Sequence, residues 1–143
     1  MLVQLTYASR VSKTLDSEDI KNILQRSQAN NQIDGVTGAL CLSNGIFLQI
    51  LEGDRNTVNR VYHKILHDER HKDPAILDYQ EISARQFSEW SMGLITRTED
   101  NKQLFLKYSS TADFDPYSMR GETLRAFFED IISNVRWLRK SPD

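Results

Sequence analysis

Two apolar runs, residues 35–43 and 46–52, are separated only by the pair Asn44-Gly45. Asparagine followed by glycine is typical of a two-residue turn, because both positions of that turn need a positive φ. The two runs are therefore predicted to pair as an antiparallel hairpin. Within the second run lies one amide, Gln49, which needs hydrogen-bonding partners if it is buried.

Segments with helical periodicity flank the hairpin on both sides. The first follows Asp16, a good N-cap residue, and Asn31 lies eleven positions after Ile20, about three turns along the same face. The second follows Asp54, and because Pro74 cannot continue a helix we expect it to end between residues 68 and 71. Its apolar stripe consists of Val58, Val61, Tyr62, Ile65 and Leu66.

Three further segments, residues 2–9, 75–82 and 93–97, are predicted to be strands. The resulting order is that of an α+β, ferredoxin-like βαββαβ fold with a five-stranded mixed sheet. In this fold we expect the first and third strands to be the adjacent, parallel, central pair, with both helices on one sheet face. Tyr7 and Gln49 would then be neighbours in the middle of the sheet.

The sheet face opposite the two helices also needs a cover, because alternate residues of the third strand are apolar on both faces. A sustained helical stripe between residues 124 and 138 is the candidate, and a shorter helix is predicted near residues 104–108. We therefore expect C-terminal helices on that face.

The charge balance and the apolar runs exclude several classes of partner. Lys plus Arg number 18 and Asp plus Glu number 20, so there is no basic excess to bind nucleic acid. No apolar run approaches the ~20 residues that cross a bilayer, and the sequence MLVQLTYASR lacks a signal-peptide pattern. We therefore expect a cytoplasmic protein with neither a nucleic-acid nor a membrane partner. The only cysteine, Cys41, lies in an apolar run and is expected to be a buried thiol.

Three polar side chains from separate elements are predicted to converge: Tyr7, Asn31 and Gln49. Together they offer the mixed donors and acceptors that match the edge of a planar heterocycle. They can also bond to one another or to water, but convergence from three independent elements favours a ligand. Ile23 and Ile65 would flank a slot between the helices as stiff walls, although their periodicity alone indicates core residues.

The end of the second helix carries a cluster of charged residues. Lys64 and Asp68 have the i, i+4 spacing of a surface ion pair, whereas Arg70 and His71 can meet a carbonyl or phosphate that enters the slot. The chain contains no GxGxxG, P-loop or GxSxG motif, so Rossmann-type binding and the common hydrolase machinery are excluded. Three histidines lie four positions apart, which is metal-ligand spacing on a helix: His63, His67 and His71. No metal site is predicted, because an exposed helix end readily carries histidine.

A series of short motifs extends over about residues 1–98. The motifs are Tyr7-Ala8-Ser9, Asn30-Asn31, Gly35-Val36-Thr37-Gly38, Gly45 to Phe47, Gln49, Leu51-Glu52-Gly53, Asp68, Arg70, His71, Phe87 and Trp90-Ser91-Met92. In order and spacing they resemble the BLUF family, the blue-light sensors that bind FAD. The tail is similar to the cap of short PixD-type members, so we expect a flavin-binding domain at 1–98 and a helical cap at 99–143 packed on the same sheet as one compact domain.

The resemblance implies a flavin ring between the two helices, with Ile23 and Ile65 on its faces. Asn31 would bond the pyrimidine side of the ring, and Gln49 would lie between the N5/O4 edge and the Tyr7 hydroxyl. FAD is the implied cofactor, with FMN or riboflavin tolerated. The other implied cofactor contacts are Ser27, Asn30, Phe47, Lys64, Asp68, Arg70 and His71.

The resemblance also implies a photosensory mechanism rather than enzymatic turnover. Tyr7 would give an electron and a proton to the excited flavin, and Gln49 would be left rotated or tautomerised, which shifts absorption to the red until thermal recovery. The signal would be transmitted through the last strand, where Ser91 and Met92 approach Gln49. Trp90 would either exchange places with Met92 or simply be packed in the core. The implied partners are further copies of the chain and a noncovalently bound signalling protein, such as one like a response regulator.

Two other readings stay open at this point. The first is a flavin-free ferredoxin-like interaction module, in which Tyr7, Asn31 and Gln49 form an internal network. The second is a small hydrolase of the acylphosphatase kind, which shares the architecture and would use Arg10 on a phosphate. A purified protein without colour would favour the first, and hydrolysis of acyl phosphates would favour the second.

Overall fold

The computed structural model describes residues 1–12, 14–89 and 92–134. The strands are β1 (Leu2–Val11), β2 (Thr37–Ser43), β3 (Ile46–Asp54), β4 (His71–Glu81) and β5 (Gly93–Thr96). The helices are α1 (Ser17–Asp34), α2 (Arg55–Leu66), α3 (Lys102–Lys107) and α4 (Gly121–Asn134), with a 3-10 turn at Pro116–Ser118.

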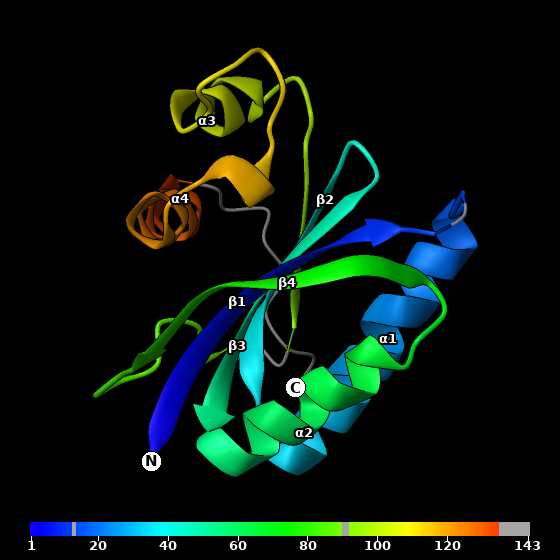
Figure 1. Ribbon diagram of the computed structural model, residues 1–143, viewed down its shortest axis with the longest axis vertical. Helices are drawn as coiled ribbons and strands as arrows, with labels where there is room; N and C mark the ends of the chain where they lie inside the picture. Colours follow the sequence, from blue (N-terminus) through cyan, green and yellow to red (C-terminus); the bar gives the residue numbers. More distant parts are fainter. Residues whose placement is uncertain (13, 90–91, 135–143) are drawn as a thin grey trace.

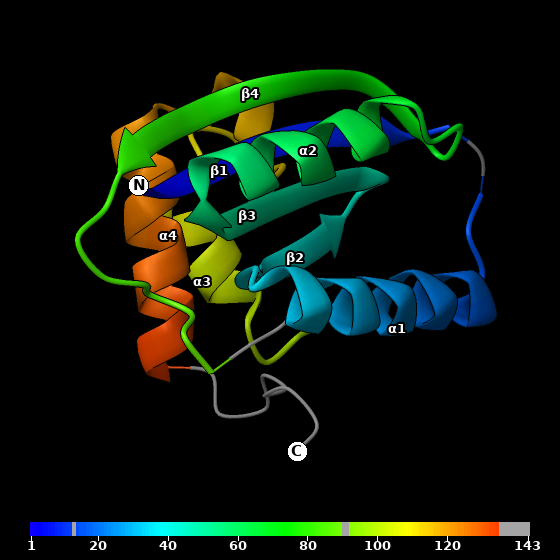
Figure 2. The ribbon, with the colours of Figure 1, turned by 90° about the horizontal axis from the view of Figure 1, so that it is seen from below.

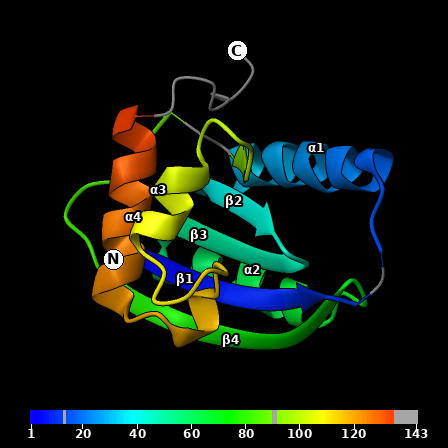
Figure 3. The same cartoon turned by 90° about the horizontal axis from the view of Figure 1, so that it is seen from above.

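Within these residues the strands form one five-stranded sheet in the order β4-β1-β3-β2-β5 (Figure 1). Helices α1 and α2 lie side by side on one face of the sheet (Figure 2), and α3 and α4 cover the other face (Figure 3). The mixed character comes from β5, which runs parallel to β2 while the other pairs are antiparallel. The ferredoxin-like α+β fold expected from the sequence is thereby confirmed.

The two central strands, β1 and β3, are neighbours but run antiparallel, so the prediction of a parallel pair is wrong. The reason is the connectivity of the chain. Helix α1 returns the chain so that β1 and β2 point the same way, and the hairpin then reverses β3 between them. In this register Tyr7 lies directly opposite Gln49, as expected.

The local signals at the hairpin and at α1 have the predicted structures. Asn44 and Gly45 have φ values of 52° and 72°, which the two-residue turn requires. Helix α1 begins with a capping box, in which the Asp16 side chain accepts from the Asp19 N–H and the Asp19 side chain accepts from the Asp16 N–H. The Asp54 side chain accepts from a backbone N–H in the first turn of α2.

Strand β4 begins at His71, four residues before the predicted start, and runs through Pro74. A proline lacks the N–H that a ladder needs, but β4 lies at the edge of the sheet, where one side of the strand has no partner strand. Helix α2 correspondingly ends at Leu66, just before the predicted range.

Strand β3 divides the interior into two hydrophobic clusters. Phe47 and Leu51 belong to the cluster under α1 and α2, whereas Leu48 and Ile50 belong to the cluster under α3 and α4. The second cluster includes aromatic side chains from both C-terminal helices, so the predicted cover is confirmed. The predicted last helix extends beyond residue 134 and therefore lies partly outside the described residues.

Two further features bear on the sequence-based expectations. Cys41 is buried and makes no disulfide, as predicted. None of the helices in the described part of the chain combines the length and apolar character that spanning a bilayer requires.

Candidate functional site

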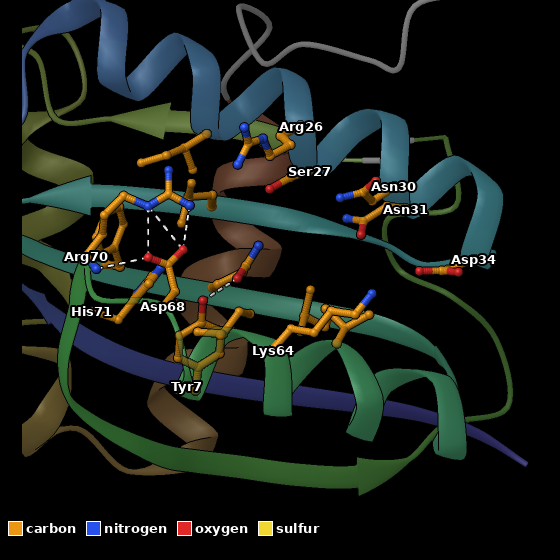
Figure 4. Close-up of a pocket in the computed structure, with 17 residues that line it drawn as sticks. Tyr7, Arg26, Ser27, Asn30, Asn31, Asp34, Lys64, Asp68, Arg70 and His71 are labelled. Atoms are coloured by element: carbon orange, nitrogen blue, oxygen red, sulfur yellow. Dashed lines mark hydrogen bonds and ion pairs between the residues drawn. The ribbon is translucent and has the colours of Figure 1, made fainter.

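A pocket opens between α1 and α2, above the middle of the sheet (Figure 4). Its volume is about 300 Å³, the lower end of the range for small-molecule sites. The pocket is lined by Tyr7, Ile23, Arg26, Ser27, Asn30, Asn31, Asp34, Leu40, Phe47, Gln49, Leu51, Val61, Lys64, Ile65, Asp68, Arg70 and His71.

A hydrogen-bonded row of three side chains starts at the floor of the pocket, where Tyr7 and Gln49 lie. The Tyr7 hydroxyl donates to Gln49 Oε1, and Gln49 Nε2 donates to Met92 Sδ at 3.3 Å. All three residues are at least 95% buried, with exposures of 1%, 5% and 0%. The amide of Gln49 therefore presents its oxygen to a phenol and its nitrogen to a thioether.

The phenol of Tyr7 stays protonated over the ordinary pH range. Burial, with smaller contributions from Tyr62 and Asp68, raises the pKa of Tyr7 far above its usual value. The rings of Tyr7 and Tyr62 are 5.3 Å apart and tilted, so the phenol is also fixed in orientation by packing. Tyr7 is thus a neutral, oriented hydrogen-bond donor to Gln49.

Helix α1 supplies hydroxyl and amide groups to one side of the pocket. Ser27, Asn30 and Asn31 line it from successive turns of the helix (Figure 4). Asn31 is 4% exposed, whereas Asn30 lies in contact with solvent. The helical spacing that placed Asn31 on the inner face of α1 is therefore confirmed.

The opposite end of the pocket is ionic. Arg70 Nε donates to both carboxylate oxygens of Asp68 at 3.0 Å, and this hydrogen bonding lowers the pKa of Asp68 to about 2. The alternative pairing of Asp68 with Lys64 is wrong, because α2 ends at Leu66 and the i, i+4 geometry is lost. Lys64 instead lines the pocket.

His71 joins this ionic end to the floor. Its Nδ1 lies 2.6 Å from the hydroxyl of Ser9, and its ring lies 4.6 Å from that of Phe47. Burial lowers the pKa of His71, although the carboxylate of Asp68 opposes that shift. The imidazole is therefore held as a neutral, oriented group at neutral pH.

The structure brings Tyr7 and the eleven predicted cofactor contacts to a single pocket. Of the predicted relay residues, Met92 contacts Gln49, whereas Trp90 and Ser91 lie outside the described residues. Sequence reasoning missed five lining residues: Arg26, Asp34, Leu40, Leu51 and Val61. Spacing gave a signal for two of them, since Arg26 lies three positions after Ile23 and Asp34 three after Asn31 on the same helix.

The other candidate residues lie away from the pocket or apart from one another. His63 and His67 are exposed, and each Nδ1 meets the carbonyl one turn earlier, at 2.7 and 2.8 Å. Within the described ranges no three His, Cys, Asp or Glu side chains are grouped as metal ligands. Arg10 is exposed, 4.7 Å from the centre of the Tyr117 ring, and does not line the pocket.

The slot has apolar side walls, amides along one edge and a buried phenol below. These are the features of a site for a flat heterocycle in an α+β domain. The residues 2–93 match the family model described as BLUF, sensors of blue-light using FAD. The chain belongs to the BLUF family.

Comparisons with individual proteins agree with this assignment. The solved structure named BlsA ground state has a TM-score of 0.86 at 29% identity, covering 99% of this chain and 93% of that one. BlrB, a BLUF protein in its dark state, has a TM-score of 0.78 at 30% identity, covering 92% and 95%. A photoactivated adenylate cyclase subunit beta from Euglena gracilis is 32% identical over 92 residues, which is 64% of this chain but only 11% of that protein.

The donor set of the pocket fits the flavin that the family model names. A flavin ring is flat, has apolar faces and carries alternating acceptors and one N–H along its pyrimidine edge. Ile23 and Ile65 match the faces, and the amides of Asn31 and Gln49 each offer both a donor and an acceptor to the edge.

Proposed function

We propose that this chain is a blue-light photoreceptor whose pocket holds the flavin ring of FAD between Ile23 and Ile65. The observation that carries the proposal is the hydrogen-bonded row that starts with Tyr7 and Gln49 at the floor of a slot of suitable size and continues to Met92. Asn31 would bond the pyrimidine side of the ring, and Gln49 its N5/O4 edge. The further contacts would come from Ser27, Asn30, Phe47, Lys64, Asp68, Arg70 and His71.

Bound flavin would supply the absorption of blue light and, once excited, a strong oxidant. The chain's own part is to provide the electron and the proton. Tyr7 is the nearest oxidisable side chain in the row, and its hydroxyl proton is already directed at Gln49 Oε1. Both return to Tyr7 on recombination, so no product accumulates and no substrate is turned over.

The lasting change would be in the amide of Gln49. Its oxygen and nitrogen are nearly equal in size, so the side chain can rotate or tautomerise without repacking the buried floor. After such a change the amide no longer offers the same N–H to Met92 Sδ. A new hydrogen bond to the flavin carbonyl would shift absorption to the red until the original arrangement returns thermally.

The output would be carried by other parts or partners rather than by this pocket. We propose that Met92 and β5 pass the change to the helical cap, in which α3 and α4 pack on the sheet face opposite the pocket. Residues 99–143 would then form the cap of one compact domain with residues 1–98. Further copies of this chain, or a noncovalently bound protein like a response regulator, would receive the signal in the cytoplasm.

The decisive measurement is an absorption spectrum of purified protein with FAD, before and after blue light. Wild type is expected to be yellow and to show a small, reversible red shift. Gln49→Leu removes the rotating amide and should lose this shift, although it still binds flavin. Gln103→Leu, the same substitution on the exposed surface of α3, is the matched control and should behave as wild type.

Other results would contradict the proposal in distinct ways. A colourless protein that does not take up FAD would favour the interaction module. Hydrolysis of an acyl phosphate, lost in Arg10→Ala, would favour the hydrolase. A full red shift in Gln49→Leu would show that the amide is not the element that changes.

A further inference from the structure

The residue that precedes β5, Met92, accepts a hydrogen bond from an amide of helix α1. Gln28 Nε2, on α1, donates to the backbone carbonyl of Met92 at 3.0 Å, across 64 positions of sequence. Met92 is fully buried, and Gln28 is half-buried. Gln28 does not line the pocket, so this contact is separate from the cofactor contacts proposed above.

This contact lies at the start of a short edge strand. The strand has four residues, lies at the edge of the sheet and pairs only with β2, in register from Ala39 opposite Gly93. Short edge strands open locally at a small fraction of the free energy of global unfolding. One additional hydrogen bond at the end of such a strand therefore changes its opening equilibrium measurably.

The connection from β4 to β5 is fixed independently at its other end. The buried carboxylate of Glu52 accepts from the backbone N–H groups of Gln86 and Phe87 at 2.8 and 2.9 Å. Arg85 donates to the Gly35 carbonyl at 2.7 Å. Within the described residues, two side chains hydrogen-bond to Met92 itself, Gln28 and Gln49.

The two local contacts of Met92 differ in strength. Thioether sulfur is a weak acceptor, so the contact of Gln49 Nε2 with Met92 Sδ contributes less than an amide-to-carbonyl hydrogen bond. The stronger contact is the one from Gln28. When Gln49 turns, the weaker contact is lost and the stronger one remains.

We propose that Gln28 is a positioning residue that keeps Met92 beside Gln49, and so couples the cofactor-binding helix α1 to β5. The inference rests on the proposed photoreceptor function. Because Gln28 sits next to Ser27 on the same helix, any displacement of α1 reaches Met92 directly. By linkage, a displacement of Met92 also acts on α1.

The first test is amide hydrogen exchange in the dark on the flavin-loaded protein. In Gln28→Leu the amides of residues 93–96 should exchange faster by about two- to tenfold, the factor expected for one lost hydrogen bond. Gln25→Leu makes the same substitution on the exposed surface of α1 and should leave these amides unchanged. Gln28→Glu keeps the side-chain shape, cannot donate when ionised, and should resemble Gln28→Leu.

The second test separates positioning from a general loss of stability. Gln28→Leu should keep wild-type flavin affinity and the full size of the red shift, because it touches neither the cofactor nor Gln49. Its dark recovery should be slower by about the same two- to tenfold factor, since Gln28 no longer holds Met92 at the position where its sulfur receives the returning N–H of Gln49.

A vibrational signature tests the bond itself. Protein labelled with ¹³C at the methionine carbonyls contains three labelled sites, and Met92→Leu identifies the band of residue 92 by its loss. In Gln28→Leu that band should move to higher frequency, as a carbonyl does when it loses a hydrogen-bond donor. Gln25→Leu should not move it.

The outcomes distinguish this inference from the proposed function. If no flavin binds, the photoreceptor proposal fails, but the exchange comparison still decides whether Gln28 positions Met92. If the red shift is present and Gln28→Leu matches Gln25→Leu in exchange, recovery and carbonyl frequency, the positioning role is overturned while the photoreceptor function stands.

Discussion

The carboxylate of Glu52 should be among the most stabilising single groups in the fold. Its side chain is completely buried and receives four hydrogen bonds from neutral donors. Oε2 accepts from Gln4 Nε2 at 2.9 Å and from the Gln86 N–H at 2.8 Å. Oε1 accepts from Thr37 Oγ1 at 3.2 Å and from the Phe87 N–H at 2.9 Å.

The substitution Glu52→Gln changes almost no volume but replaces one acceptor oxygen by an NH₂ group. The Thr37 hydroxyl and the Gln4 amide can reverse their roles, but each carboxylate oxygen also accepts from a backbone N–H, which cannot. Wherever the new NH₂ is placed, it therefore faces the N–H of Phe87 or that of Gln86. That conflict costs about 1–3 kcal/mol. The other bonds lose charge assistance worth about 1 kcal/mol each, and the smaller desolvation cost of an amide offsets part of this loss. The net destabilisation expected is about 2–4 kcal/mol.

Urea unfolding, followed by far-UV circular dichroism, measures this difference. For a chain of this size, a loss of about 2–4 kcal/mol lowers the unfolding midpoint by roughly 1–3 M. Glu81→Gln makes the same change at an exposed position of β4 and should stay within about 0.5 kcal/mol of wild type. If the two variants unfold at the same urea concentration, the carboxylate does not anchor the β4–β5 connection and the reasoning is refuted.

Two further predictions follow from the ionic and amide ends of the pocket. Because Arg70 lowers the pKa of folded Asp68 to about 2, while that of an unfolded aspartate is about 4, its stabilising effect is present above pH 4 and disappears as the pH falls to about 2. The unfolding free energy of Asp68→Asn should therefore fall less steeply with decreasing pH over this range than that of wild type. Equal pH dependences in the two proteins would contradict the pairing of Asp68 with Arg70. Asn31→Leu should weaken flavin binding about 5- to 100-fold in a fluorescence titration, whereas Asn22→Leu on the exposed face of α1 should not.

Local chemistry was the part of the fold that could be predicted from the sequence. The Asn44-Gly45 turn and the Asp16 cap depend on a few neighbouring residues, and both form as expected. Asn31 was placed correctly because a helix keeps its periodicity over three turns. The residues of the pocket floor could be predicted from the order of the elements, because that order puts Tyr7 opposite Gln49.

Features that depend on distant neighbours could not be predicted in this way. Pro74 stops a helix or a central strand, and only the position of β4 at the sheet edge explains why it is tolerated. The direction of β3 relative to β1 follows from the connectivity rather than from any local pattern. Gln28 gave no signal at all, because its partner, the backbone carbonyl of Met92, lies 64 positions away in the sequence.

The burial of β3 on both faces has a consequence for sequence variation. Every residue from Ile46 to Gly53 is buried, and consecutive side chains alternate between the cluster beside the pocket and the cluster beneath the C-terminal helices. From Ile46 to Gly53 the strand therefore offers no solvent-facing position at which mutations are neutral. In a saturation mutagenesis library we expect it to be the least tolerant segment, with adjacent positions failing for different reasons: one by loss of colour, the next by loss of the response to light.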